Sequence, residues 1–329
     1  MANFDIAEAI KNTSMYELAC KTMQNIEMSE TEETVVSELD KHFKEIGKTG
    51  YDKDHEISAF IQKVINEEVY NTPDELLDRL FYSNSIGADD DFEEIEEAKN
   101  TLVAHEAAQG GNVPKSYLDI SVCKPVWKNR QIETEISYAD LRKNGWKSVA
   151  KLTEYAVAAL KNTRFKDIFD NIDAAITSGA ENYITVSGAT MTQAAADALA
   201  LRVNDYNEGN GVIVGYSKYI QQISKLQGFE SDDMKNEVHR TGRLGMYDGV
   251  DLTPISSVRK LGDGSGLFTD KRVFGIAGKI GTISQKGEMS VYQTSNNNKE
   301  KIELKFANFT YGWAISPEGI KKVCKAVLS

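Results

Sequence analysis

Apolar residues in the first hundred positions recur at the spacing of amphipathic helices, between marked start and stop signals. Residues 29–47 open with a Ser and Thr cap region and acidic side chains, and Gly47 follows the last basic residues. These features predict a helix with both ends defined. Residues 71–83 and 89–109 show the same pattern. Because so few amphipathic helices do not make an obvious core, we expect residues 1–104 to form an acidic helical arm that packs on something else.

The hydrophobic period changes to two beyond the glycine pair at positions 110 and 111. The alternating positions are Leu118, Ile120, Val122, Ile132, Thr134 and Ile136. This alternation predicts a long two-stranded hairpin at residues 105–133, with residues 124–131 as its tip. An isolated hairpin is marginal in water, yet this one carries Val126 and Trp127. We therefore expect it to be covered by its own chain or to lie across another molecule.

The longest helical signal runs from residue 148 to residue 178, which contain no Gly or Pro. Its apolar residues form a stripe near the 3.6-residue period, with one break at Asn162 and Thr163. A helix of about 28 residues extends for roughly 42 Å, and Gly179 marks its end. We expect this helix to set the size of the domain that it crosses.

The remaining sequence mixes the two periods. Residues 182–188 and 211–217 indicate short strands, and residues 190–207 a helix capped at Thr190, before the chain becomes glycine-rich and strand-like. Residues 301–329 predict two alternating strands, a turn at a proline and a short closing helix.

The glycines at positions 275, 278 and 281 surround a lysine, as in a phosphate-binding loop. Such a loop needs Gly-x-x-x-x-Gly-Lys-Ser/Thr at the start of a helix, so that backbone N–H groups converge on the anion. Here Ile280 follows the lysine, Val273 takes the place of the first glycine, and the following residues alternate like strands. We interpret this segment as a strand punctuated by glycines.

Composition narrows the class of protein. With 329 residues, 41% of them hydrophobic, the chain can bury a sizeable core, and we expect two compact units or one with long appendages. No apolar run approaches the roughly 18 residues of a membrane span, and acidic Asp5 and Glu8 stand where a signal peptide is basic. Cys20, Cys123 and Cys324 are odd in number and far apart, which argues against disulfides or a zinc site and for a reducing compartment.

Charge is unevenly distributed along the chain. Residues 1–100 carry 9 Lys and Arg against 25 Asp and Glu, whereas the other 229 residues carry 29 against 25. Such an acidic region repels a nucleic-acid backbone, so we do not expect sequence-specific DNA binding. The acidic residues of 88–97 are those of a solvated helix start more than of a Ca²⁺ or Mg²⁺ site.

Three segments, residues 130–179, 211–226 and 305–323, resemble a known family in their order and architecture. A helical arm, a long hairpin, a spine helix, a mixed domain and a returning strand resemble the major capsid protein of tailed bacteriophages. Its fold is the Hong Kong 97-like fold, which encapsulin nanocompartments share. The resemblance covers about residues 98–329.

The resemblance implies an α+β fold with an N-terminal arm, an extended loop, a peripheral domain with its spine helix, and an axial domain. The corresponding expected ranges are 1–104 (arm), 105–133 (extended loop), 134–183 (peripheral domain), 184–299 (axial domain) and 300–329 (C-terminal return to the peripheral domain).

In function, the resemblance implies self-assembly into hexamers and pentamers that form the icosahedral head of a tailed double-stranded DNA phage. It implies the chain itself as partner, portal and scaffolding proteins, a decoration protein, and packaged DNA without sequence-specific contacts. The expected location is the virion, after synthesis in the bacterial host cytoplasm. Two alternatives stay open: an encapsulin shell around an enzyme cargo, and a soluble nucleotide-dependent enzyme.

In this family the extended loop reaches over a neighbouring subunit. The expected interface residues are Tyr117, Lys124, Val126, Trp127, Lys128, Arg130 and Gly278. Trp127 is the expected apolar anchor, because buried Trp and Arg carry interface energy more often than other residues. The alternative is that Trp127 packs on its own spine helix. The glycines at 275, 278 and 281 would thin a strand where chains crowd near a symmetry axis.

The resemblance raises two further questions, about processing and about chemistry. Many relatives lose an N-terminal scaffolding segment to a protease, but the well-capped helices lead us to expect that this arm stays in the shell. Facing inward, its charge would keep DNA from adhering. The sequence shows no catalytic constellation, so we expect no enzyme, no cofactor and no metal. Some relatives form Lys–Asn isopeptide links, but no reacting pair is identifiable among Lys115, Lys124 and Lys128 of the hairpin and the asparagines at 296–298.

Overall fold

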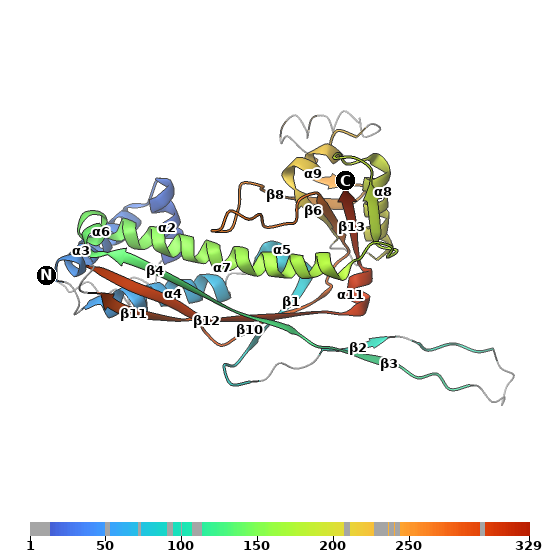
Figure 1. Cartoon of the computed structure of the whole chain (residues 1–329), viewed down its shortest axis with the longest axis horizontal. Helices are drawn as coiled ribbons and strands as arrows, with labels where there is room; N and C mark the ends of the chain where they lie inside the picture. The colour runs from blue at the N-terminus through green and yellow to red at the C-terminus, as the bar shows by residue number, and fades with distance from the viewer. Residues whose placement is uncertain are drawn as a thin grey trace.

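The structure is a computed structural model that describes residues 14–49, 53–71, 74–90, 95–99, 101–106, 114–206, 211–226, 236, 240, 244–296 and 300–329. Figure 1 shows an elongated body crossed by one long helix, with a sheet along its lower side and a second sheet at one end. A thin two-stranded projection leaves the body below the second sheet. The two sheets and the long helix together position the projection.

The long helix is α7 (Trp146–Ala175), which has 30 residues. It begins two residues before the range that the apolar stripe predicted. Apolar or half-buried residues lie on nearly every side, and its exposed positions are Lys147, Lys151, Tyr155, Ala174 and Ala175. A helix that is apolar around most of its circumference is buried. The helix is therefore the centre of the body, not a lid on it.

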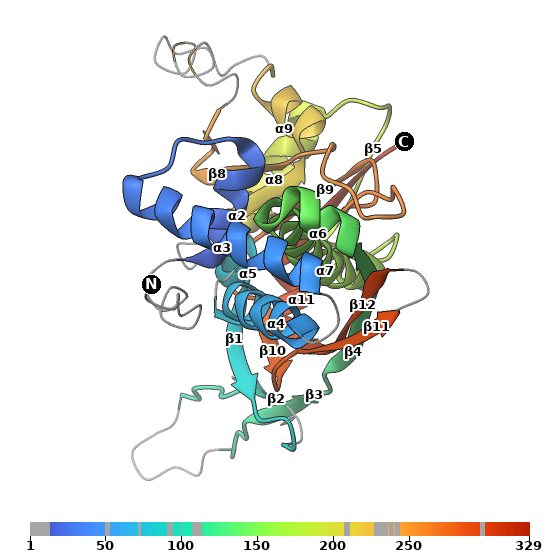
Figure 2. The ribbon, with the colours of Figure 1, turned by 90° about the vertical axis from the view of Figure 1, so that its left-hand side faces the viewer.

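Four helices cover the first half of α7: α2 (Met15–Gln24), α3 (Glu30–Thr49) and α4 (Asp54–Asn71) of the N-terminal arm, and α6 (Tyr138–Asn144), which directly precedes α7. The last helix of the arm, α5 (Glu75–Leu80), is followed directly by the strand β1 (Phe81–Ile86). Figure 2 shows α3, α4 and α6 around this end of α7. Trp146 stacks on Phe43 of α3 and meets the edge of Phe60 of α4, with ring centroids 6.2 and 5.8 Å apart. The arm thus packs on its own chain and shares the core of the body.

The first sheet, called here the peripheral sheet, is built around one long strand. Its strands are β1 (Phe81–Ile86), β4 (Val126–Ser137), β10 (Gly281–Lys286), β11 (Ser290–Asn296) and β12 (Lys301–Ile315). Strand β4 pairs antiparallel with β12 along one side, β10 and β11 pair along the other, and β1 runs parallel to β10. A bulge between Phe306 and Phe309, with Asn308 at φ 65°, shifts the register. The extra residue keeps Phe309 on the buried face.

Helix α4 closes the free edge of β11 with two side-chain amides. The Val291 N–H donates to Gln62 Oε1 at 3.0 Å. Asn66 Nδ2 donates to the Met289 carbonyl at 3.0 Å, and the Met289 N–H donates back to Asn66 Oδ1 at 3.2 Å. An open strand edge is a template for pairing with another chain. Gln62 and Asn66 lie four residues apart on one face of α4. Their amides bond the backbone groups at this edge, so these groups are not open to pairing with another chain.

The second sheet, called here the axial sheet, has the strand order β5-β13-β9-β6-β8-β7. Its strands are β5 (Tyr183–Val186), β6 (Val212–Tyr216), β7 (Met246–Tyr247), β8 (Val250–Ile255), β9 (Arg272–Ile276) and β13 (Val323–Leu328). Its helices are α8 (Gln193–Asp205), α9 (Ser217–Ile223) and α11 (Pro317–Lys321). Every residue of β6 is buried, as its unbroken apolar run predicted.

Several expected elements differ from the observed ones. Residues 89–109, expected as a helix, contain the strand β2 (Ile95–Lys99). The helix expected to be capped at Thr190 is capped at Thr192, whose hydroxyl accepts from the Ala195 N–H. The short closing helix is present as α11 (Pro317–Lys321), but the chain does not end in it: the residues that follow form the strand β13, because a short apolar run buried between layers has no period that tells helix from strand.

The expected boundary between axial domain and C-terminal return also differs from the sheet topology. Strands β10 and β11, within the expected axial range 184–299, belong to the peripheral sheet, and β13, within the expected peripheral return 300–329, lies in the axial sheet. The two strands expected before the proline are one strand, β12, in which the bulge interrupts the alternation. Strand partners are decided by pairing across the fold, which local periodicity does not encode.

Candidate assembly interface

The projection is a hairpin whose two legs stay side by side beyond their ladder. Strand β2 pairs antiparallel with β3 (Asp119–Cys123), from Ile95 opposite Cys123 to Lys99 opposite Asp119. Further out, the Thr101 hydroxyl donates to the Tyr117 carbonyl, and the Val103 N–H donates to Ser116 Oγ at 3.2 Å. Figure 1 shows these legs extending away from both sheets. The hairpin is called here the extended loop.

The extended loop lies earlier in the chain than the sequence predicted. Residues 124–131, expected as its tip, are its base: Val126 opposite Trp313 begins the long pairing of β4 with β12. The first leg comes from residues 95–99 and 101–103, which were expected to belong to the arm. The sequence of this leg is acidic and has almost no apolar alternation, so it did not indicate a strand. The outermost residues, 107–113, lie outside the described part of the chain.

Large apolar side chains along the loop are exposed. Their exposed fractions run from 40% to 74% for Leu102, Val103, Tyr117, Leu118, Ile120, Val122 and Val126. A two-stranded ladder has two faces and no interior, so successive side chains point to opposite sides and neither side is covered by the described residues. A contiguous set of exposed apolar residues marks a site of contact with another molecule.

The structure brings the expected interface residues Tyr117, Lys124, Val126 and Lys128 to the surface of the loop and its base. Tyr117 is the most exposed of them, at 74%. Their contact with a neighbouring subunit stays a prediction.

Trp127 is half-buried against its own chain. It stands opposite Gly312 of β12, and a Cβ added at Gly312 would lie 2.8 Å from Trp127 Cε3. Arg130, three positions along β4, points to α7, so the alternation of the strand turns Trp127 to the opposite face of the sheet. Its ring therefore covers the glycine on the face away from the spine helix, so the expected packing on the spine helix is wrong, while the contact with an adjacent subunit stays a prediction.

Arg130 ties the peripheral sheet to the spine helix. Its guanidinium binds Asp167 of α7, with Nη2 2.6 Å from Oδ1 and Nε 3.1 Å from Oδ2, and the Tyr311 hydroxyl donates to Oδ2 at 2.5 Å. The hydrogen bond to Asp167 raises the pKa of Arg130. Burial, and then the hydrogen bond to Asp167, raises the pKa of Tyr311. The structure thus shows an internal role for Arg130, while a contact with a neighbour stays a prediction.

Gly278 lies in the connection between β9 and β10, at φ +67°, and a Cβ there would meet no described atom within 4 Å. Its backbone conformation, which side chains other than glycine rarely adopt, is what requires glycine. By contrast, Gly281 is crowded by its own chain, since a Cβ would lie 2.1 Å from the Ala314 carbonyl oxygen. The crowding expected between chains at Gly278 stays a prediction.

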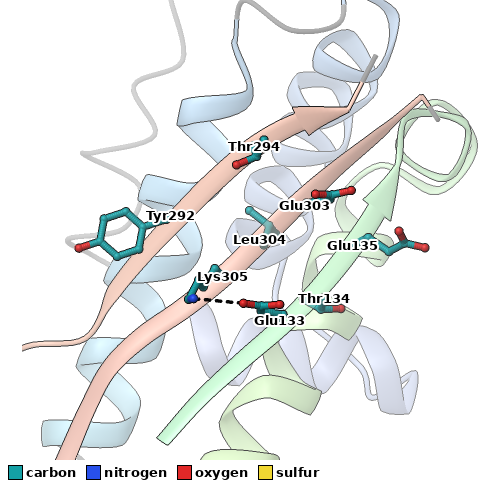
Figure 3. Close-up of a pocket in the computed structure, with 8 residues that line it drawn as sticks. All are labelled: Glu133, Thr134, Glu135, Tyr292, Thr294, Glu303, Leu304 and Lys305. Atoms are coloured by element: carbon teal, nitrogen blue, oxygen red, sulfur yellow. Dashed lines mark ion pairs between the residues drawn. The ribbon is translucent and has the colours of Figure 1, made fainter. Parts of the chain in front are cut away.

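A shallow groove of about 470 Å³ lies on the peripheral sheet, on the face away from α7. Figure 3 shows its lining, which is Glu133, Thr134, Glu135, Tyr292, Thr294, Glu303, Leu304 and Lys305. Lys305 Nζ lies 3.1 Å from Glu133 Oε1, and Glu135 pairs with Lys301. Sequence reasoning did not find this groove, because its carboxylates meet only through the register of β4, β11 and β12.

Two classes of site can be assessed across the described residues. Within them, no group of three or more His, Cys, Asp and Glu side chains is placed to hold a metal ion. The helices of the same residues include none both long and apolar enough to span a bilayer.

Comparison with known proteins shows which protein family the chain matches. The family model described as "SPbeta prophage-derived putative capsid protein YonB" matches residues 21–308. Among curated proteins, none matches the chain in sequence.

Solved phage structures share the arrangement of elements. One from Gordonia phage Cozz is 13% identical, with a TM-score of 0.53, over 76% of this chain and 84% of that chain. One from Microbacterium phage Oxtober96 is 12% identical, with a TM-score of 0.52, over 78% and 92%. One from Mycobacterium phage Ogopogo is 11% identical, with a TM-score of 0.51, over 74% and 90%. At these identities the likeness concerns the fold.

Spine helix, extended loop and two sheets define the Hong Kong 97-like fold, as the resemblance implied. The chain belongs to the YonB family of capsid proteins, since the family model covers most of its length.

Proposed function

We propose that this chain is the major capsid protein of a tailed double-stranded DNA phage and assembles into the hexamers and pentamers of an icosahedral head. The observation that carries the proposal is the extended loop, whose exposed apolar side chains are left uncovered by the described residues of its own chain. Such surface is stabilised when a second copy covers it.

The geometry of the loop suits a heterologous contact. A loop on one side of a subunit that binds a different surface of the next subunit gives a head-to-tail interface, and such interfaces close into rings. Rings of six and five subunits can tile a closed surface. A standard interface buries about 1,600 Å², and an apolar loop lying along a neighbour contributes such a patch for each subunit.

We assign the contact to both faces of the loop and its base. Tyr117, Ile120 and Val126 supply apolar area, and Lys124 and Lys128 supply charge at the rim. The exposed part of Trp127 adds to this surface from the peripheral sheet. Arg130 and Gly278 stay in the proposed contact, in addition to the roles that they have within the subunit.

The remaining assignments follow from the capsid family. We propose the virion as location, synthesis in the bacterial cytoplasm, and portal, scaffolding and decoration proteins as partners. Packaged DNA would make no sequence-specific contacts. The N-terminal helices stay in the mature shell, because they share the core with α7 and close the edge of β11. The integrated arm favours retention over removal by a protease.

The test replaces apolar side chains of the loop. Leu118→Ser combined with Ile120→Ser should leave the circular dichroism spectrum unchanged and abolish particles seen by negative-stain microscopy and light scattering. Leu201→Ser is the matched control, because Leu201 is 62% exposed but lies on α8, away from the loop. Normal particles from the loop variant, or a native chain that stays monomeric at high concentration, would overturn the proposal.

The contents of purified particles separate the two shell alternatives. Packaged DNA with a portal and tail identifies a phage head, and an enzyme cargo without them identifies an encapsulin. A small oligomer of fixed size would instead favour an enzyme.

A further inference from the structure

The two sheets are joined by short connections within the described residues. Residues 176–182, 277–280 and 316–322 pass between the peripheral side and the axial side. Short connections of this kind permit rotation unless side chains hold the two parts together. Side-chain contacts between α5, α7 and the axial sheet therefore decide how freely the axial sheet moves.

A buried ion pair holds the axial sheet to the last turn of α7. Lys325 of β13, which is 5% exposed, places Nζ 3.0 Å from Asp173 Oδ1 and donates to the Asp173 carbonyl at 2.7 Å. Arg272 of β9 lies 3.4 Å from the same carboxylate oxygen. A cation at the carboxyl end of a helix is also favoured by the helix dipole. Because breaking a buried pair is costly, we expect this contact to stay formed while the subunit is folded.

A second contact lies earlier on the same helix, at Asn162. The connection between β8 and β9, residues 256–271, is called here the strap. Near the end of the strap that leads into β9, Phe268 packs against Phe165 and Phe169 of α7, with ring centroids 5.5 and 4.6 Å away. Near its outer end, Arg259 Nε donates to Asn162 Oδ1 at 2.6 Å. Asn162 is the residue that interrupts the apolar stripe of the spine helix, and the bond to Arg259 gives this 5% exposed amide a partner.

A third contact joins the axial sheet to α5. Arg79 Nη2 lies 2.7 Å from Asp251 Oδ2 of β8, with both side chains about a third exposed or more. Arg259 is exposed as well. The exposed Arg79–Asp251 pair exchanges with water and contributes little to stability, so it can open while the protein stays folded. The Arg259–Asn162 bond joins an exposed guanidinium to a buried amide, so opening it costs more, but it is one hydrogen bond at the edge of the core and can also open without unfolding of the core.

The positions of the contacts give them different mechanical roles. Asn162 and Asp173 are eleven residues apart on one helix, or roughly 16 Å. Held at both points, the axial sheet cannot turn relative to the spine helix. Released at Asn162 and at Arg79, it keeps the buried contacts of Asp173 and of Phe268 with the last turns of α7, and it can turn about that end of the helix.

We propose that Arg259–Asn162 and Arg79–Asp251 are two releasable latches that fix the angle between the axial sheet and the spine helix, with Lys325–Asp173 as the pivot. The device is built into the single chain and holds whether or not the chain forms a shell.

Spin-label distance measurement tests the latches. Labels are placed at Lys147→Cys on α7 and Leu201→Cys on α8, both exposed, in a chain carrying Cys20→Ala and Cys123→Ala. The labelled chain is diluted in a large excess of unlabelled chain, so that only distances within one chain are measured. We expect one narrow distance distribution for the native latches, and a broader or displaced one for Arg79→Ala with Arg259→Ala.

The control removes the same charge from exposed lysines, Lys63→Ala with Lys260→Ala, and should keep the native distribution. A native distribution in the double arginine variant would overturn the proposal, and so would an equal broadening in the lysine control. If the double arginine variant fails to fold by circular dichroism, each single arginine variant gives the same test with the same two outcomes.

Discussion

The Asp167 carboxylate of the spine helix accepts hydrogen bonds from Nε and Nη2 of Arg130, which joins the helix to the edge strand of the peripheral sheet. Tyr311 from the central strand donates to the same carboxylate. One helical side chain thus sets the distance of two strands from α7.

Replacement of this carboxylate should destabilise the subunit. Asp167→Ala leaves Arg130 and Tyr311 without their acceptor, and we expect the free energy of unfolding to fall by about 2 kcal/mol in urea denaturation. Asp170→Ala, which removes an exposed pair with Lys166 one turn away, should cost less than about 0.5 kcal/mol. Equal losses for the two variants would contradict a special role for Asp167.

Glycine replacements should separate backbone strain from crowding. Gly278→Ala meets no described atom and should cost about 1 kcal/mol through its positive φ. Gly281→Ala places a Cβ against the Ala314 carbonyl and should cost about 3 kcal/mol. Gly278→Asn should be milder than Gly278→Ala, because asparagine tolerates this conformation. Thermal unfolding of the variants gives the order, and a costlier change at 278 than at 281 would reverse our assignment.

The edge of β11 should depend on the amide of Asn66. Asn66→Ala leaves the N–H and the carbonyl of Met289 without their side-chain partner, so we expect a loss of about 2 kcal/mol. Hydrogen exchange at Met289 should rise in the same variant. Lys63→Ala, on an exposed position of the same helix, should change stability by less than about 0.5 kcal/mol. Unchanged exchange at Met289 in Asn66→Ala would refute the capping role.

The start of α3 should respond to acid through Glu32. A hydrogen bond from Lys21, and then those from Ser29, lower the pKa of Glu32 to about 2. Since the folded pKa lies below the unfolded value of about 4.3, the stabilisation is present above pH 4.3 and is lost as the pH falls through 2. The melting temperature of Glu32→Gln should be lower than that of the native chain at pH 7, with a gap that closes toward pH 2.

The control for this prediction is Glu33→Gln, at the next and more exposed position. Its difference from the native chain should stay nearly constant with pH. A gap for Glu32→Gln that widens in acid would show that the ion pair does not stabilise the fold.

The amino-acid sequence by itself determined the elements whose residues satisfy one local period. The spine helix needed only thirty residues without glycine or proline and an apolar stripe, and β6 needed only a short apolar run. The order of these elements along the chain was enough to indicate the capsid fold, because that order can be read from the sequence without knowing any tertiary contact.

Only the tertiary structure decided which strands pair and which surfaces are left uncovered. β3 pairs with acidic β2, which shows no alternation, and the bulge in β12 divides one strand into two apparent ones. Arg130 and Trp127 contact α7 and Gly312 within the chain, and Gly278 has a positive φ, none of which a local pattern predicts. Such contacts join residues far apart in the chain, and their energies come from packing and pairing that no local pattern records.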